Sequence, residues 1–137
     1  MIVHWPAGHL PGGKLRHAPA HVIDVVPTLL ELAGATAIPV ADAPPRPGRS
    51  LTLALGKDLP IPRDHLYFHH EGNRALRVGD WKLVSFQENN NAWELYDLST
   101  DRAEMNDLAA RHPDRVKEME TRWKGLTEEF ARQAGPP

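Results

Sequence analysis

Three consecutive residues, His69, His70 and Glu71, offer the first candidate chemistry in this chain of 137 residues. Imidazole nitrogens and carboxylate oxygens are common ligands of divalent metals. Neighbouring side chains of a strand point to opposite faces, so the two histidines cannot easily bind one ion. A zinc site also needs three or four converging ligands. We therefore expect the histidines to pair with backbone or water, or to line the edge of a cleft, and we expect no metal site in this chain.

Residues suited to nucleophilic catalysis are present without the surroundings that would activate them. Ser50, Ser85 and Ser99 lack a nucleophile-elbow pattern such as Gly-x-Ser-x-Gly. The stretch Gly12-Gly13-Lys14 predicts a turn rather than a phosphate-binding loop. Taken by themselves, the residues indicate an α/β domain without a recognisable active site.

Composition narrows the classes of partner. The formal net charge is -2, with acidic and basic residues interspersed, which argues against a nucleic-acid partner because such a protein needs a basic face. No apolar run reaches the ~20 residues needed to cross a bilayer, so no membrane span is expected. The absence of cysteine excludes disulfides and thiolate metal sites. Residues 1–6 show no signal-peptide pattern, and the location stays unknown.

The first element that could position side chains is the apolar run Ile2–Trp5, which ends at Pro6. It predicts a strand. A strand needs a neighbour, so it is either a small edge strand of this domain or an inner strand of a larger sheet whose other strands are missing. Both possibilities remain open from the sequence.

A helix is predicted over Val25–Ala33. Asp24 can cap its start, Pro27 falls in the first turn, and Gly34 occupies the place of a left-handed C-terminal cap. Apolar residues cover more than half of its circumference, so it is expected to be well buried. Residues 35–63 contain six prolines and predict a connector with at most a short helical turn at 49–55.

The second half of the chain predicts an antiparallel sheet and a long helix. Gly79-Asp80 is a two-residue turn typical of tight hairpins, and short connections imply antiparallel pairing. The expected strands are His65–His70, Arg74–Val78, Trp81–Phe86 and Trp93–Leu98. A helix beginning at Pro113 carries an apolar stripe at steps of 3, 4, 3 and 4, formed by Val116, Met119, Trp123, Leu126 and Phe130. That stripe is expected to pack on the sheet.

Several stretches, in the same order, resemble the C-terminal part of formylglycine-dependent sulfatases, particularly bacterial arylsulfatases. The most specific is Glu71-Gly72-Asn73-Arg74-Ala75-Leu76-Arg77, continued by Gly79-Asp80-Trp81-Lys82-Leu83-Val84. The other stretches are Ile2–Pro6, His21–Gly34, Gly48–Leu51, Trp93–Leu98 and Asn106–Ala109. Together they span nearly the whole chain.

The resemblance implies which chemistry this chain does not contain. Sulfatases attack the sulfate ester with a formylglycine made in a Cys/Ser-x-Pro-x-Arg motif, and Asp and Asn side chains hold a divalent cation, usually calcium. In the family these groups precede the strand that matches Ile2–Trp5. This sequence contains neither cysteine nor Ser-x-Pro-x-Arg. No catalytic residue and no metal ligand is therefore assigned here, and calcium is expected only in full-length members. Asn106–Asp107 matches a different block and predicts a cap before a helical turn.

The resemblance also implies the fold class, α/β with an α+β C-terminal end. Residues 1–34 are expected to be a remnant strand and helix of an alkaline-phosphatase-like catalytic sheet, and residues 35–63 a Pro-rich connector. Residues 64–137 are expected to form the C-terminal subdomain, a four-stranded antiparallel sheet packed by a long helix. The sequence analysis of the elements leads to the same order.

We expect a C-terminal fragment of an arylsulfatase-like sulfuric ester hydrolase that is inactive alone. Its partner is then the missing N-terminal catalytic half, and uncovered apolar strand and helix faces are expected to cause self-association. The alternative is a stand-alone, non-catalytic binding or interaction module derived from this fold. The residues expected to border the substrate pocket lie where the first two strands meet: His69, His70, Glu71 and Asn73.

Overall fold

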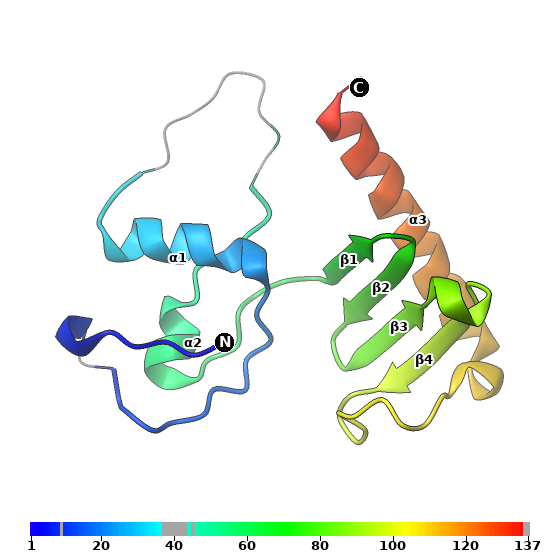
Figure 1. Cartoon of the computed structure of the whole chain (residues 1–137), viewed down its shortest axis with the longest axis horizontal. Coiled ribbons are helices and arrows are strands. Elements are labelled where there is room, and N and C mark those ends of the chain that lie inside the picture. Colours follow the sequence, from blue (N-terminus) through cyan, green and yellow to red (C-terminus); the bar gives the residue numbers. More distant parts are fainter. Residues whose placement is uncertain (9, 37–43, 45, 136–137) are drawn as a thin grey trace. The chain divides into compact units, whose positions relative to one another are not determined.

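The computed structural model describes residues 1–8, 10–36, 44 and 46–135. The chain divides into two compact units, Met1–Pro62 and Arg63–Pro137 (Figure 1). Each unit has hydrophobic core residues of its own. Among the described residues, no helix combines the length and the apolar character that a membrane span requires.

The second unit contains a four-stranded antiparallel sheet in the order β1-β2-β3-β4. Its strands are β1 Leu66–His70, β2 Asn73–Val78, β3 Trp81–Ser85 and β4 Trp93–Asp97. Gly79, at φ 59°, makes the tight turn between β2 and β3, where its lack of a Cβ permits the left-handed conformation. The predicted sheet and its antiparallel order are confirmed.

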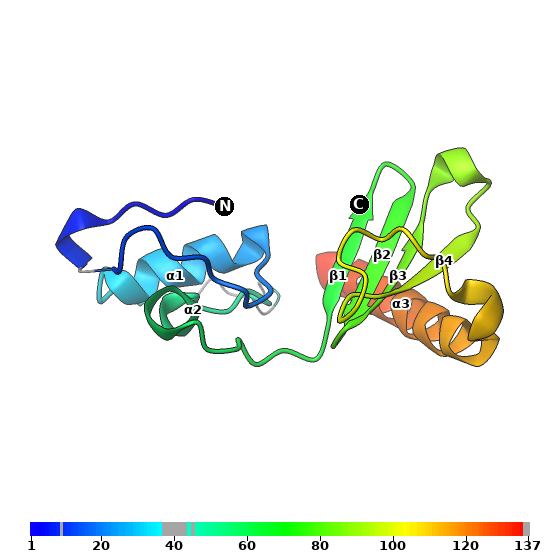
Figure 2. The same ribbon diagram turned by 90° about the horizontal axis from the view of Figure 1, so that it is seen from below.

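The long helix α3, Pro113–Ala134, packs on one face of this sheet (Figure 2). The side chains between them form the main core: Leu76, Leu83, Leu95, Met119 and Trp123. Burying each such side chain contributes roughly 1.5–3 kcal/mol relative to leaving it exposed. Val116 and Leu126 pack against this core, and the ring of Phe130 lies 5.0 Å from that of Tyr67. The predicted apolar stripe therefore faces the sheet.

The opposite face of the sheet carries a smaller cluster of Ala75, Val84 and Tyr96. Lys82 and Glu104 form an ion pair of 2.6 Å on this side. Within the described part of the second unit, α3 is the only α-helix. One face of the sheet is thus covered by a helix, and the other is covered by side chains and loops.

The first unit contains a 3-10 turn η2, Val22–Asp24, and the helices α1, Val25–Leu32, and α2, Thr52–Lys57. α1 closely matches the predicted helix, and α2 corresponds to the helical turn predicted at residues 49–55. Gly34 has φ 61°, which confirms the predicted left-handed cap. Residues 37–43 and 45 of the predicted connector lie outside the described residues.

Asp24 joins η2 to the segment before α2 and makes no side-chain cap hydrogen bond to α1, so the predicted cap is wrong. One carboxylate oxygen accepts a hydrogen bond from the His21 amide at 2.7 Å, and the other accepts one from the Arg49 amide at 2.8 Å. The hydroxyl of Thr28 likewise accepts from the Leu51 amide at 2.9 Å. Asp24 is fully buried, and its carboxylate joins η2 to a backbone amide 25 residues further along the chain.

Gly48 explains why the family pattern Gly-Arg-Ser-Leu begins with glycine. A Cβ at this position would lie 2.1 Å from the carbonyl oxygen of Ile23, far closer than van der Waals contact allows. Without a side chain, the backbone can approach η2 and bring the Arg49 amide to Asp24. The segment is therefore architectural.

Helix α1 is not well buried, contrary to the expectation from its apolar composition. Thr28 is its only buried residue, while Val26 is 54% and Leu29 is 61% exposed. The contacts with α2 are made through polar side chains on the other side of the helix. Among the described residues of this unit, Pro27 and Leu30 are partly covered, while Val25, Val26, Leu29 and Leu32 are exposed.

Residues Ile2–Trp5 do not form the predicted strand. They precede a 3-10 turn, η1, at Pro6–Gly8, and the side chain of Ile2 is 97% exposed. A strand needs a neighbour for its backbone hydrogen bonds, and in the described residues the four strands of the sheet pair only with one another. The predicted edge strand of this domain is wrong. The alternative, a strand of a larger sheet, stays a prediction.

Candidate substrate edge

The turn between β1 and β2 places the four predicted site residues at one end of the sheet. His70 pairs with Asn73 across the hairpin, and Glu71 and Gly72 form the two-residue loop. Both loop residues have positive φ, 48° and 81°, as in the turns that best match strand twist. Asn-Gly is the favoured pair in such turns, so a glutamate at the first position is unusual.

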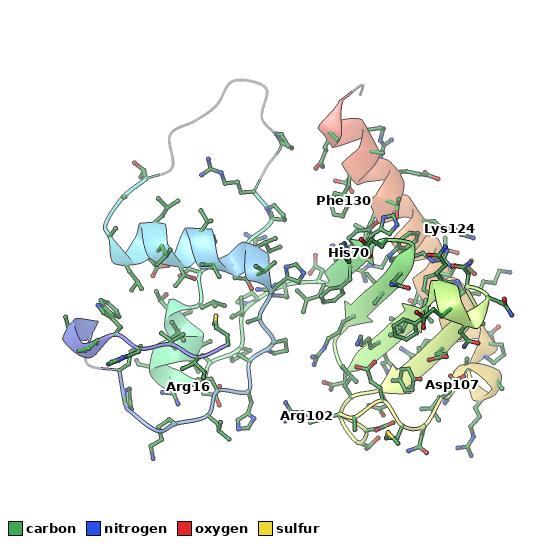
Figure 3. All side chains as sticks on the ribbon, in the orientation of Figure 1. Arg16, His70, Arg102, Asp107, Lys124 and Phe130 are labelled. Atoms are coloured by element: carbon green, nitrogen blue, oxygen red, sulfur yellow. The ribbon has the colours of Figure 1, made fainter. Side chains whose placement is uncertain are left out.

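The two histidines point to opposite faces, as strand geometry predicts. The ring of His69 meets that of Trp123 edge-on at 5.4 Å on the α3 side. The Nε2 of His70 lies 3.8 Å from a carboxylate oxygen of Glu71, and these side chains are 85% and 82% exposed. His70 marks this end of β1 in Figure 3, at the opposite end of the sheet from Arg102. Both histidines are exposed, but only His69 has a ring contact with α3, so His70 is the one whose side chain extends away from the helix.

Asn73 connects this turn to the loop that follows β3. Its Oδ1 accepts a hydrogen bond from the Gln87 amide at 3.0 Å, at the start of the 3-10 turn η3, Gln87–Asn89. Gly72 lies against the side chain of Gln87. The sequence predicts the flanking strands Trp81–Phe86 and Trp93–Leu98 but not that the loop between them meets this turn. The antiparallel strand order was the available signal, because it places the first and third connections at the same end of a sheet.

The side chain of Arg74 packs against two tryptophan rings next to the turn, on the α3 side of the sheet. Its guanidinium lies 4.6 Å from the ring centroid of Trp93 and 5.5 Å from that of Trp123. One of its terminal nitrogens donates to Ser85 Oγ at 2.8 Å and to the Asn91 carbonyl at 3.3 Å. Cation–π contacts of this kind contribute roughly 0.5–2 kcal/mol each. Arg74 therefore links the end of β3, at Ser85, to the loop before β4, at Asn91.

Of the other residues considered for chemistry, Ser85 and Asp107 have structural roles. Ser85 is fully buried and bonded to Arg74. Asp107 Oδ1 accepts from the amides of Leu95 at 2.9 Å and Ala109 at 2.8 Å, so it ties β4 to the start of the 3-10 turn η4, Ala109–Arg111, although Leu108 and not Asp107 holds the N-cap position. Among the residues that the structure describes, no three His, Asp or Glu side chains converge as metal ligands.

Comparison with known proteins identifies the family. Residues 1–132 match the family described as N-sulphoglucosamine sulphohydrolase, C-terminal. The chain belongs to this sulfatase C-terminal family. The resemblance deduced from the motifs is thereby confirmed.

Curated relatives of this sulfatase C-terminal chain are themselves sulfatases. An uncharacterized sulfatase of Schizosaccharomyces pombe is 32% identical in an alignment of 122 positions that covers 74% of this chain and 20% of that protein. An N-acetylgalactosamine-6-O-sulfatase of Bacteroides thetaiotaomicron is 30% identical in an alignment of 133 positions that covers 87% of this chain and 25% of that protein. The chain thus spans about a fifth to a quarter of the length of these relatives. One relative is a yeast protein, so the relatives are not confined to bacteria.

Solved structures share the fold of this sulfatase C-terminal chain. The crystal structure of Ps i-CgsB matches with a TM-score of 0.64 and 24% identity, over 97% of this chain and 33% of that chain. The structure of BT4656 in complex with D-glucosamine-2-N,6-O-disulfate matches with a TM-score of 0.56 and 24% identity, over 80% of this chain and 24% of that one. The predicted fold class is confirmed for the sheet and the long helix.

Proposed function

We propose that this chain is the non-catalytic C-terminal part of a sulfuric ester hydrolase and does not hydrolyse sulfate esters alone. The observation that carries the proposal is the family match over residues 1–132 in a sequence without cysteine or a Ser-x-Pro-x-Arg motif. A sulfatase needs the formylglycine made from that motif as its nucleophile. Calcium is expected to be bound by the catalytic half, which holds the Asp and Asn ligands in the sulfatases that this chain resembles.

The proposed substrates are sulfate esters of sugars, with aryl sulfates as the second class to test. Two relatives carry the names N-acetylglucosamine-6-O-sulfatase and N-acetylgalactosamine-6-O-sulfatase. The arylsulfatase-like function expected from the motifs remains a prediction. Substrates of both classes therefore belong in the same assay.

The proposed contribution of this chain to the substrate pocket is the β1–β2 turn. His70 and Glu71 are exposed and adjacent, and they offer an imidazole and a carboxylate to hydroxyl groups. Glu71 also has a left-handed φ of 48°, which Asn or Gly adopts at lower energetic cost. Residues held in such conformations cluster at functional sites. His69 supports the turn through its ring contact with Trp123. Asn73 supports it by accepting a hydrogen bond from the Gln87 amide.

The proposed partner is the N-terminal catalytic half, bound through the apolar face of α1. Val22, Val26 and Leu29 on η2 and α1 are 77%, 54% and 61% exposed. A continuous apolar surface of this kind usually marks a protein interface. The relatives have three quarters or more of their length outside the matched region, which supplies a partner large enough to cover it.

The function is tested by assaying the chain alone and joined to a sulfatase catalytic half, with calcium, 4-nitrophenyl sulfate and N-acetylglucosamine 6-sulfate. Only the joined protein should turn over either ester. His70→Ala should change the ratio of kcat/KM between the two substrates by about three- to tenfold, the effect of losing one hydrogen bond. His112→Ala is the control, since the ring of His112 meets that of Trp81 edge-on at the other end of the sheet. Turnover by the purified chain alone would refute the proposal.

A stand-alone binding module is the second candidate. It is favoured by one observation: residues Arg63–Pro137 enclose a hydrophobic core between their own sheet and helix. This candidate predicts a stable monomer that binds a ligand without a catalytic half. The neighbouring DNA separates the two, because only the first candidate requires a reading frame encoding Cys/Ser-x-Pro-x-Arg upstream.

A further inference from the structure

The face of the sheet opposite α3 presents two exposed phenylalanines near the β1–β2 turn. Phe68 is 37% and Phe86 is 46% exposed. Phe68 pairs with Ala75, and Ala75 pairs with Val84, so Phe68 lies on the face that carries the smaller cluster. Phe86 follows β3 with extended backbone, φ -105° and ψ 138°. Two residues after Val84, it lies on the same face.

Two polar side chains lie near these rings: His70 follows Phe68 on the same face of β1, and Asn73 lies on β2 between β1 and Phe86. His70 pairs with Asn73, and since Arg74 pairs with Ser85, the register places Asn73 opposite Phe86. His70, Asn73 and Phe86 therefore lie side by side in one row across the three strands. Phe68 lies in the neighbouring row, two residues before His70 on β1. Asn73 accepts its hydrogen bond from the amide of the residue after Phe86. By fixing the backbone at Gln87, Asn73 acts as a positioning residue for the ring of Phe86.

This arrangement suits a sugar ring. A sugar has apolar C–H faces and a rim of hydroxyl groups, so it needs apolar side chains bordered by hydrogen-bonding groups. The two exposed phenylalanines on this face offer the apolar contacts, and the imidazole of His70 and the carboxylate of Glu71 offer the border.

We propose that Phe68, Phe86 and His70 form a platform that holds a sugar ring of the substrate, with Asn73 fixing its width. This proposal rests on the proposed function, since the sugar substrate class enters there. It extends the substrate edge from the turn onto the helix-free face of the sheet.

The platform is tested by NMR titration of the full chain, labelled with 15N, with N-acetylglucosamine 6-sulfate and, separately, with inorganic sulfate. The amide signals of Phe68, His70, Asn73 and Phe86 should shift with the sugar sulfate and not with sulfate alone. Phe86→Ala should weaken binding about three- to tenfold, as expected for loss of one aromatic contact. Phe86→Tyr should restore it. Met105→Ala, at a 78% exposed apolar side chain of another loop, should leave binding unchanged.

Asn73→Ala should weaken binding of the sugar sulfate, as Phe86→Ala does. Asn73→Asp should bind like the unchanged chain, because an aspartate keeps the acceptor for the Gln87 amide. Equal affinities of Phe86→Ala and the unchanged chain, or shifts caused equally by inorganic sulfate, would overturn the platform. Shifts of these signals with an added catalytic half but not with sugar would make this face a protein interface and also overturn it. Sugar binding without sulfatase activity in the joined protein would refute the proposed function and leave the platform standing.

Discussion

At the residue scale, Glu71 has a backbone conformation that its side chain does not favour. A β-hairpin loop with two positive φ angles needs residues that tolerate the left-handed region, and asparagine followed by glycine is preferred. The chain has Gly72 at the second position and a highly exposed glutamate at the first. The hairpin itself gains nothing from this carboxylate beyond an exposed contact with His70, which contributes little to stability.

Replacing Glu71 with Asn should therefore stabilise the chain by about 0.5–1 kcal/mol, because asparagine adopts the left-handed conformation at lower cost. Urea unfolding followed by tryptophan fluorescence measures the change. Glu88→Asn is the matched control, since Glu88 is also exposed but does not have positive φ. Equal effects of the two substitutions would show that the turn conformation is not the cause.

At the element scale, Asp101 organises the middle of the loop after β4. One oxygen of Asp101 accepts hydrogen bonds from the amides of Met105 and Asn106, each at 2.8 Å. These hydrogen bonds, that of Asn106 first, hold the pKa of Asp101 below its usual range. The loop also carries Glu104, which reaches Lys82 on β3, so its order affects the helix-free face of the sheet.

The stability of the chain should consequently depend on pH through Asp101. A carboxyl with a lowered folded-state pKa contributes stability that is fully present above its usual pKa and is lost as the pH falls through the lowered value, below about pH 4. Asp101→Asn should lower the Tm at pH 7 and flatten this acid dependence. Thermal unfolding between pH 2.5 and 7 measures both, with Glu118→Gln on the exposed side of α3 as the control. An unchanged acid slope in Asp101→Asn would contradict the assignment.

At the scale of the whole molecule, the two units differ in how completely they bury their apolar residues. The second unit buries five side chains between sheet and helix. The first leaves Val26 and Leu29 mostly exposed and relies on hydrogen bonds of Asp24 and Thr28. The first unit therefore has the larger apolar surface available to a partner, and in the absence of one it is available to a second copy.

We predict that the chain alone self-associates at about 50 μM through this face. Leu29→Glu should shift it toward monomer, since burying an unpaired charge is costly. Leu15→Glu is the control, at an 81% exposed leucine outside the helices. Light scattering measures the mass of each variant. A monomeric unchanged chain, or equal effects of the two substitutions, would count against a docking role for α1.

The sequence by itself determined the sheet, the long helix, the short helices of the first unit and the family, because these depend on local periodicity and on ordered motifs. Side chains alternate along strands and recur every 3.6 residues along helices, so the stripe from Val116 to Phe130 was readable without coordinates. Tertiary structure alone decided which distant groups meet. Strand register placed Asn73 beside Gln87 and Phe86, and a backbone approach at Gly48 brought Arg49 to Asp24. Local pattern does not encode such contacts, because they arise only when separate elements pack.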